Sequence, residues 1–270
     1  MALVTGGALR LGRAICLRLS ESAVPVVIHC RSSTKEAYEL KELIEASREG
    51  ARAEVVVCDL KDSAAAESLV ETASLALGGE GINTLVNSAS MFTHDDLESL
   101  EEEGKGGLFA EHMQVNLLAP ALLCKGFQRH VKARVAAGDT IQSGTLSIVN
   151  ILDQKLANTN PDHLSYTLSK YGLAGLTDTL AVSLAADGIR CNAVSPGFVL
   201  PNEADGMGTA ELLAAQAKSP LGYGPAPTDV AAAVGFLASA DTARAITGQT
   251  LYVDSGERFN MRDRDVALVP

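Results

Sequence analysis

The stretch ALVTGGALRLGRAICLRLS, residues 2–20, decides the fold that we expect for this chain. An apolar run over residues 2–5 leads into a turn that holds Gly6, Gly7 and Gly12, and the pattern that follows is typical of a helix. Glycines permit a tight turn, and the helix behind it directs its N-terminal N–H groups and the positive end of its dipole toward one point. A strand, a glycine turn and a helix in this order predict a site for the pyrophosphate of a dinucleotide.

Further short apolar runs follow, and longer helical patterns separate them. They are PVVIHC (25–30), AEVVVC (53–58), INTLVN (82–87), TLSIVN (145–150), IRCNAV (189–194) and TLYV (250–253). Unbroken apolar strands that alternate with helices indicate a parallel sheet covered on both faces. We therefore predict an α/β fold, a Rossmann-type doubly wound parallel β-sheet of about seven strands, in a single NAD(P)-binding domain over residues 1–270. Ligands are expected beyond the carboxyl ends of the strands.

Composition excludes several classes of partner. The net charge is −11, from 22 basic and 33 acidic residues, so no basic stripe is available for nucleic acid. No apolar run approaches the roughly 18 residues that a membrane helix needs. The first strand-like run starts at Ala2, so no signal peptide is expected within the chain as given. Five scattered cysteines without CxxC spacing are expected to be reduced thiols, which favours the cytoplasm: Cys16, Cys30, Cys58, Cys124 and Cys191.

Two segments interrupt the alternation of strands and helices. Residues 88–106 are polar and acidic, and residues 198–227 hold prolines and glycines around one short helical run. Both begin just after a predicted strand end, where binding loops are expected. The second has the composition of a movable lid over a substrate.

The end of the second predicted strand bears on the choice of cofactor. An NAD site usually has an acid there, whereas this chain has HCRSS (29–33), with Arg31 and Ser32. A guanidinium with hydroxyl donors suits a 2′-phosphate, so we expect NADP(H); the alternative is a solvated arginine in a loop. Asp59, after the third strand, is expected either to bind the adenine amine or only to cap the helix that begins near Ser63.

Asp153, Tyr166 and Lys170 indicate a site that moves protons. Residues four apart share a helix face, so the Lys170 ammonium is expected beside the Tyr166 phenol, where it favours the ionised form. A tyrosine whose ordinary pKa is about 10 needs such help to act near neutral pH. The spacing alone also fits an accidental surface pair.

Five motifs stand in the order found in the short-chain dehydrogenase/reductase family, which the chain resembles over nearly its whole length. They are the glycine turn, Asn87 in LVNSAS, Asn116 in MQVNLLAP, YxxxK at 166–170 and SPG at 195–197. The resemblance implies that Tyr166 delivers a proton, that Lys170 binds the nicotinamide ribose and lowers the tyrosine pKa, and that Asn116 holds a water of the proton relay. It implies these cofactor contacts: Gly6, Arg10, Leu11, Gly12, Arg31, Ser32, Asp59, Leu60, Asn87, Ser88, Ala89, Tyr166, Lys170, Pro196 and Gly197.

Asp153 departs from the serine that most of the family has at this position. An aspartate there is similar to the pteridine reductases and the dihydromonapterin reductases, as are RLG at 10–12, Phe92 in NSASMF and the tail VDSGERF. The flat ring of a pterin could stack on Phe92, and a carboxylate could bind its amino and ring-nitrogen edge or return a proton to the tyrosine. Arg10 and Ser90 would contact both pterin and cofactor phosphate, although Arg10 could serve the phosphate alone.

Three hypotheses about function follow. The first is an NADPH-dependent reductase of a pterin, with the particular pterin and the use of folates left open. The second is an NADPH-dependent reductase of a carbonyl compound (3-oxoacyl, sugar or quinone); Asp153 opposes it, because a carboxylate repels a developing oxyanion. The third is a redox-sensing binding protein, which has no need of Tyr166 and Lys170.

Metal binding and assembly complete the expectations. No metal is expected, because the histidines show no ligand spacing. The helix that continues from Tyr166 has one apolar stripe through Leu173, Leu176, Leu180 and Leu184 and a second through Leu168, Gly172, Gly175 and Val182. A helix that is apolar on two sides must be covered twice. We therefore expect a homotetramer built through paired helices.

Overall fold

The computed structural model describes residues 1–100, 106–159, 161–199 and 219–259. Its centre is a seven-stranded sheet in the order β3-β2-β1-β4-β5-β6-β7, and every neighbouring pair of strands is parallel. The strands are β1 (Ala2–Val4), β2 (Val26–Cys30), β3 (Ala53–Val57), β4 (Thr84–Asn87), β5 (Leu146–Ile151), β6 (Ile189–Pro196) and β7 (Thr250–Val253). All seven fall on the predicted apolar runs, with ends that differ by at most two residues. The predicted Rossmann-type fold is confirmed.

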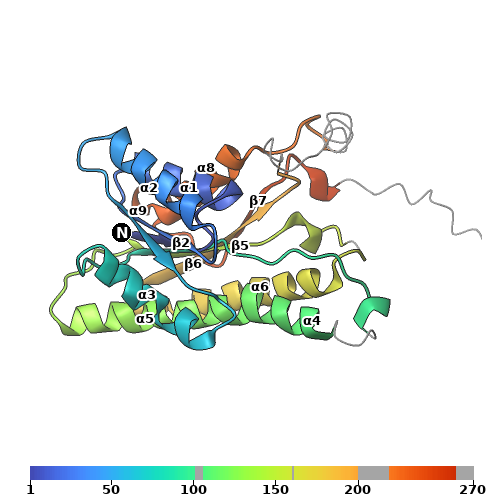
Figure 1. Ribbon diagram of the computed structural model, residues 1–270, viewed down its shortest axis with the longest axis horizontal. Coiled ribbons are helices and arrows are strands. Elements are labelled where there is room, and N and C mark those ends of the chain that lie inside the picture. Colours follow the sequence, from blue (N-terminus) through green and yellow to red (C-terminus); the bar gives the residue numbers. More distant parts are fainter. Residues whose placement is uncertain (101–105, 160, 200–218, 260–270) are drawn as a thin grey trace, which may run out of the picture.

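Helices cover both faces of the sheet (Figure 1). One layer holds α1 (Arg10–Glu21), α2 (Thr34–Ser47) and α8 (Pro227–Ala238), with the short α9 (Ala240–Ala243) beside them. The other holds α3 (Ser63–Ala76), α5 (Ala119–Ala136) and α6 (Leu164–Ser183), extended by α4 (Gly106–Met113) and a π-helical stretch, η2 (Gln114–Leu118). Four 3-10 turns complete the described elements: η1 (Glu98–Leu100), η3 (Gln154–Leu156), η4 (Ala185–Asp187) and η6 (Glu257–Phe259).

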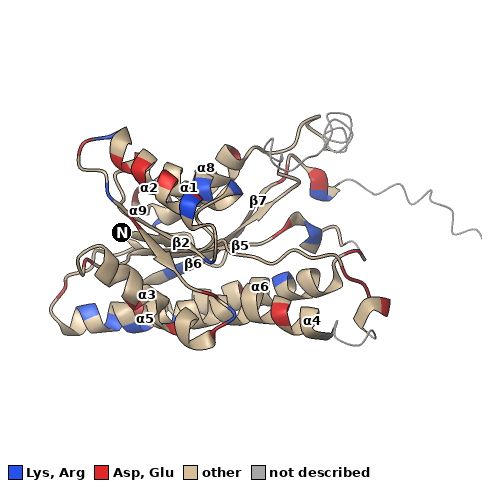
Figure 2. Ribbon diagram, viewed as in Figure 1, with Lys and Arg blue, Asp and Glu red and all other residues tan. Residues whose placement is uncertain are grey.

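Two apolar cores, one on each face, hold these layers to the sheet. Strand residues alternate between them: Leu3 packs with α3 and α5 residues such as Phe127, whereas Val4 packs with α1 and α2 residues such as Ile15. Each fully buried side chain of this size contributes roughly 1.5–3 kcal/mol through lost apolar surface. Charged residues lie mainly on the helices and loops that surround the sheet (Figure 2). No helix among the described residues is long and apolar enough to cross a membrane.

The strand order reverses direction between β1 and β4, and this reversal positions the candidate site. Chain order runs outward from β1 through β2 and β3 on one side, and from β4 to β7 on the other. All strands are parallel, so the loops after β1, β4, β5 and β6 leave from the same edge of the sheet. The loops on the two sides of the reversal turn away from each other there. This edge is where ligands are expected.

The two irregular segments are only partly described. The loop after β4 runs through η1 to residue 100, and α4 begins at Gly106. Of the predicted lid over residues 198–227, residues 200–218 lie outside the described residues. The described part of the lid is its two ends, residues 198–199 and 219–227.

Candidate active site

Two adjoining cavities open at the carboxyl edge of the sheet. The first has a volume of about 440 Å³ and is walled by the ends of β1, β2 and β3. The second has a volume of about 530 Å³ and extends past the ends of β5 and β6 to Asp153 and Tyr166. Four residues of the glycine turn and the β4 loop line both cavities, so this is where the two cavities meet: Gly6, Leu9, Ala89 and Ser90. Together they form one long cleft.

The glycine turn is packed too tightly for any other residue at two positions. A Cβ atom on Gly12, in the first turn of α1, would lie 2.0 Å from the carbonyl oxygen of Gly6. Gly6 itself has a φ of +63°, and a Cβ there would lie 2.9 Å from the Cα of Ala89. The turn therefore presses against the β4 loop and leaves the N-terminal end of α1 facing the cleft, as a pyrophosphate requires.

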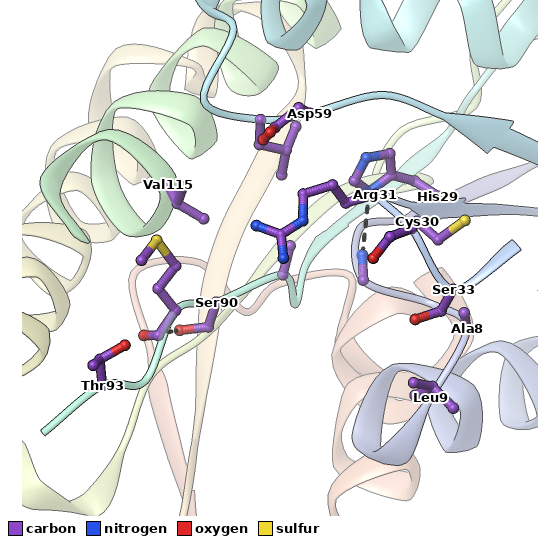
Figure 3. A pocket seen from close by; sticks show the side chains of 15 residues that line it. Ala8, Leu9, His29, Cys30, Arg31, Ser33, Asp59, Ser90, Thr93 and Val115 are labelled. Carbon is purple, nitrogen blue, oxygen red and sulfur yellow. Dashed lines mark hydrogen bonds between the residues drawn. The ribbon is translucent and has the colours of Figure 1, made fainter. Parts of the chain in front are cut away.

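The first cavity contains the residues predicted to recognise the adenosine end of a cofactor. Arg31, Ser32, Asp59 and Leu60 line it, and the Arg31 side chain extends into it (Figure 3). Among the described residues, no carboxylate pairs with Arg31, which leaves its charge for an anionic ligand. Asp59 accepts a hydrogen bond from the Lys61 N–H at 2.9 Å, whereas the cap of α3 is Asp62. The alternative that Asp59 only caps this helix is therefore wrong.

Asp153, Tyr166 and Lys170 converge in the second cavity. The Tyr166 hydroxyl donates a hydrogen bond to Asp153 Oδ2 at 2.7 Å, and Asp153 Oδ1 accepts from the Lys155 N–H at 2.8 Å. Lys170 Nζ lies 5.6 Å from the Tyr166 ring centroid and donates to the Ile151 carbonyl at 2.7 Å. An accidental surface pair is excluded, because Tyr166 is 6% and Lys170 only 2% exposed.

The electrostatics of this trio differ from the expectation. Burial, and then the negative charge of Asp153, raise the pKa of Tyr166 well above its ordinary value. Burial lowers the pKa of Lys170 to about 8, while the charge of Asp153 acts in the opposite direction. The predicted lowering of the Tyr166 pKa is therefore not seen in this structure: the net shift is upward, and Lys170 is not among its causes. Asp153 bonds the hydroxyl directly, whereas the more distant ammonium is bound to a carbonyl group.

Phe92 lies beside this trio and lines the same cavity. Its ring stacks on His163, with centroids 4.2 Å apart and planes 11° apart, and meets the Tyr166 ring edge-on at 4.7 Å. Lys155 Nζ lies 5.2 Å from the centroid of Phe92. Phe92 remains 57% exposed, so the ring is accessible from the cleft although one face already has a partner.

Three residues tether the loop that carries Phe92, and two of them, Asp95 and His112, were not predicted as site residues. Asp95, which is 2% exposed, accepts hydrogen bonds at the start of α6 from the N–H and hydroxyl of Ser165, while its carbonyl accepts from His163 and Leu164. His112 Nε2 accepts from the Thr93 N–H at 3.3 Å. The third tether is Asn116. An acid that directly precedes a helix can be recognised from sequence as its cap. Asp95 caps α6, which begins about 70 residues later, so no local sequence pattern indicates this role.

The side chains of Asn116 and Asn87 both bind protein groups in this structure. The Asn116 side chain, fully buried in the π-helical stretch, accepts from the Met91 N–H and the Ser90 hydroxyl and donates to the Met91 carbonyl and to Ser169. Its amide group is thus used to fix the loop. Asn87 is 2% exposed, donates to Asn150 at 2.8 Å and lines neither cavity.

Most of the other predicted site residues line the cleft. Arg10, Leu11, Gly12, Ser88, Pro196 and Gly197 line the second cavity, and Ala89 and Ser90 line both. Thr5, not predicted, supports this loop because its hydroxyl accepts from the N–H groups of Ser88 and Ala89. Glu257, from the VDSGERF tail, accepts from Gln154 Nε2 and from the Phe198 N–H, which fixes the start of the lid segment. In the described ranges, no group of three acidic, histidine or cysteine side chains is placed to hold a metal ion.

Comparison with known proteins shows which proteins this chain is similar to. A family model described as enoyl-(acyl carrier protein) reductase matches residues 7–257. The 3beta-hydroxysteroid dehydrogenase 1 of Eggerthella lenta is 33% identical over 94% of this chain and 91% of its own length. The 3-oxoacyl-(acyl-carrier-protein) reductase FabG of Staphylococcus aureus is 29% identical over 94% of this chain and 96% of its own.

Solved structures with the same fold include two proteins crystallised with NADP. FolM alternative dihydrofolate reductase 1 from Brucella canis has a TM-score of 0.82 and 34% identity, covering 98% of this chain and 97% of that one. Its counterpart from Brucella suis has a TM-score of 0.83 and 34% identity, covering 98% of each chain. Both are similar to this chain over nearly the entire length.

Proposed function

Because the chain belongs to the short-chain dehydrogenase/reductase family, we propose that it is an NADPH-dependent reductase whose substrate is a dihydropterin or a related pterin. The coarser part of this statement, an NADP-dependent oxidoreductase, follows from the family and from the NADP-bound structures to which the chain is similar. The finer part, the pterin, is carried by one observation: Asp153 stands where most of the family has serine, and it bonds the Tyr166 hydroxyl.

The cleft fits the cofactor on three grounds. Gly12 and Gly6 leave no room for a side chain between the turn and the β4 loop, so a pyrophosphate can approach the backbone at the start of α1. Arg31 supplies a positive charge without a carboxylate partner among the described residues. Asp59 and Leu60 wall the adenosine end. When bound, the nicotinamide supplies the hydride.

The substrate end fits a flat, nitrogen-rich ring. Phe92 offers an accessible aromatic face on the same cavity wall as Asp153 and Tyr166. A carboxylate is a strong acceptor for the amino and ring N–H groups of a pterin. For a carbonyl substrate, the same carboxylate would repel the negative charge that develops on the oxygen. Asp153 therefore favours the pterin over the ketone.

Tyr166 donates the proton, and Asp153 helps to replace it. Burial and the Asp153 charge raise the pKa of Tyr166, so its hydroxyl is protonated at neutral pH and donates only to an atom that becomes strongly basic as hydride arrives, such as a pterin ring nitrogen. Once the proton passes to a substrate nitrogen, the pair of oxygens carries an additional negative charge. The Lys170 ammonium, 5.6 Å from the tyrosine ring centroid, offsets that charge. Asp153 then receives a proton from solvent and returns it to the tyrosine.

A substrate panel tests the proposal. Wild-type protein should oxidise NADPH with dihydrobiopterin or dihydromonapterin faster than with 3-oxoacyl, sugar or quinone compounds, and faster than it oxidises NADH with the same pterins. Replacing Asp153 with alanine should reduce kcat for the pterin by about 10²–10⁴-fold. Folded protein that binds NADPH and turns over no pterin would contradict the substrate while leaving the family intact.

The second candidate is an NADPH-dependent reductase of a carbonyl compound. It is favoured by relatives such as FabG of Staphylococcus aureus, which is a 3-oxoacyl-(acyl-carrier-protein) reductase by name. Turnover of a 3-oxoacyl thioester that exceeds turnover of every pterin in the panel would select it. A non-catalytic redox sensor is disfavoured because Tyr166, Lys170 and Asp153 are assembled as a proton-transfer site.

We also propose that the protein is a cytoplasmic homotetramer. The inner stripe of α6 is covered, since Leu173 and Leu184 are buried, whereas Leu168 is 42% and Val182 is 79% exposed on the outer side. Tyr171 adds to this outer apolar surface. A second subunit would cover it. A solution mass equal to the 28.1 kDa of one chain at micromolar concentration would contradict the assembly.

A further inference from the structure

His29, a residue of β2, holds both glycines that open the cofactor turn. Its ring Nδ1 accepts a hydrogen bond from the Gly6 N–H at 3.2 Å, drawn as a dashed line in Figure 3. Its main-chain carbonyl accepts from the Gly7 N–H at 2.8 Å. Two successive N–H groups of the turn therefore bind one residue of the neighbouring strand.

The other ring nitrogen of His29 reaches the third strand. His29 Nε2 lies 3.1 Å from the carbonyl oxygen of Cys58, which immediately precedes Asp59 and Leu60 in the wall of the first cavity. Because a carbonyl only accepts, Nε2 must carry the hydrogen, and Nδ1 is then free to accept from Gly6. The imidazole thus links the turn after β1 to the end of β3 in one defined tautomer.

The surroundings of His29 keep the ring neutral. The side chain is 2% exposed, and burial lowers its pKa, while the Cys58 carbonyl and the nearby Asp59 carboxylate act in the opposite direction. A proton on Nδ1 would remove the acceptor for Gly6, whose half-buried N–H group would then lose this partner.

We propose that neutral His29 is a positioning residue for the cofactor: its Nδ1 sets the Gly6 turn in the conformation that receives the NADP pyrophosphate. The hydrogen bond to Gly6 fixes a backbone with φ of +63° against Ala89, and through Gly6 it fixes the approach of Gly12. The inference rests on the proposed cofactor and is independent of the proposed substrate.

Two variants separate the two ring contacts. In His29→Asn, the amide oxygen occupies the place of Nδ1 and can still accept from Gly6. In His29→Gln, the amide nitrogen occupies the place of Nε2 and can still donate to Cys58, but Gly6 loses its acceptor. We expect fluorescence titration to show NADPH affinity about tenfold weaker in His29→Gln and within about threefold of wild type in His29→Asn.

The outcomes distinguish this inference from the proposed function. Wild-type protein that fails to bind NADPH would contradict the proposed cofactor, and the inference with it. Wild-type protein that binds NADPH, with equal affinity in the two variants, would overturn the role of His29 alone. A purely structural role also predicts equal loss in both variants, because each removes one buried hydrogen bond.

A pH titration gives a second measurement. NADH is the probe, because it lacks the 2′-phosphate whose own ionisation falls near pH 6. Because burial lowers the pKa of His29 below its ordinary value of 6.5, His29 should contribute no change of NADH affinity between pH 8 and 6.5. Lys170, whose pKa is about 8, also titrates in this range, so the pH profile of wild type is compared with that of His29→Asn, which keeps Lys170. Profiles of equal shape are expected, and a step in wild type that is absent from His29→Asn would overturn the neutral state of the ring.

Discussion

The two ends of the cleft are built in different ways. At the cofactor end, the shape is set by backbone packing within a few residues of the strand ends, as in the contact of Gly12 with Gly6. At the substrate end, Phe92 and Tyr166 are placed by contacts between segments far apart in the chain, such as Asp95 with Ser165 and Asn116 with Met91. At the first end the glycine turn is fixed by close backbone packing, and at the second the loops are fixed by polar tethers that cross between them. Substitutions should therefore act on binding at one end and on turnover at the other.

The largest effect is expected at the substrate end, from Tyr166→Phe. Loss of the hydroxyl removes the proton donor and leaves Asp153 without its 2.7 Å partner, so kcat with a dihydropterin should fall about 10³-fold. NADPH affinity, measured by fluorescence, should change far less than kcat. Tyr171→Phe is the matched control, because that hydroxyl bonds Thr159 and the Leu156 carbonyl away from the cleft. Similar losses of kcat in both variants would contradict the assignment.

At the cofactor end, Gly12→Ala should weaken NADPH binding by about 100-fold or more. The added Cβ would lie 2.0 Å from the Gly6 carbonyl oxygen, so the turn and α1 must separate. Isothermal titration gives the affinity, and thermal unfolding reports any loss of fold. Gly107→Ala is the control, since its Cβ meets nothing within 4 Å. If Gly12→Ala binds NADPH as wild type does, the turn is not the rigid element that the packing indicates.

Loss of the Asp95 tether should reduce kcat/KM for the pterin by about tenfold. Asp95→Ala leaves the Ser165 N–H and hydroxyl without their acceptor at the start of α6, which should cost about 1–3 kcal/mol of folding free energy. Because α6 carries Tyr166, kcat/KM for the pterin should fall while NADPH affinity stays close to wild type. Urea unfolding and steady-state kinetics measure the two effects. Glu98→Ala, at an exposed acidic position of the same loop, is the control and should show neither.

The different construction also explains how much the sequence could predict. The seven strands were found because buried parallel strands are continuous apolar runs, and the glycine turn because its packing is local. The positions of Asp153 and Phe92 in one cavity came from resemblance to a family rather than from spacing. Asp95 and His29 were missed because their partners lie 70 and 23 residues away. The raised pKa of Tyr166 was missed because it depends on burial, which no four-residue spacing reveals.

The free energy of unfolding should depend on pH through Lys170. Burial lowers its pKa to about 8, below the ordinary value of 10.5, so between these pH values the unfolded state binds more protons than the folded state. The free energy of unfolding contributed by this group should therefore rise with pH above about 8, by about 1.4 kcal/mol per pH unit at most. Urea unfolding at pH 7 to 9.5 measures the free energy of unfolding of wild type and of Lys170→Met, and the difference between the two gives the contribution of Lys170. A difference that is constant with pH would contradict the lowered pKa.

The smallest effect is expected at His163, which supports Phe92 from behind. His163 has a φ of +97°, a conformation that asparagine also tolerates, so His163→Asn removes the stacked ring with little backbone strain. Losing an aromatic contact of this kind should raise KM for a pterin about threefold, because Phe92 is then less fixed in the cleft. His94→Asn, whose ring lies 5.3 Å from that of His163, is the control and should raise KM less. An unchanged KM in His163→Asn would mean that the tethers on the loop alone position Phe92, which would place the rigidity of the substrate end entirely in its polar contacts.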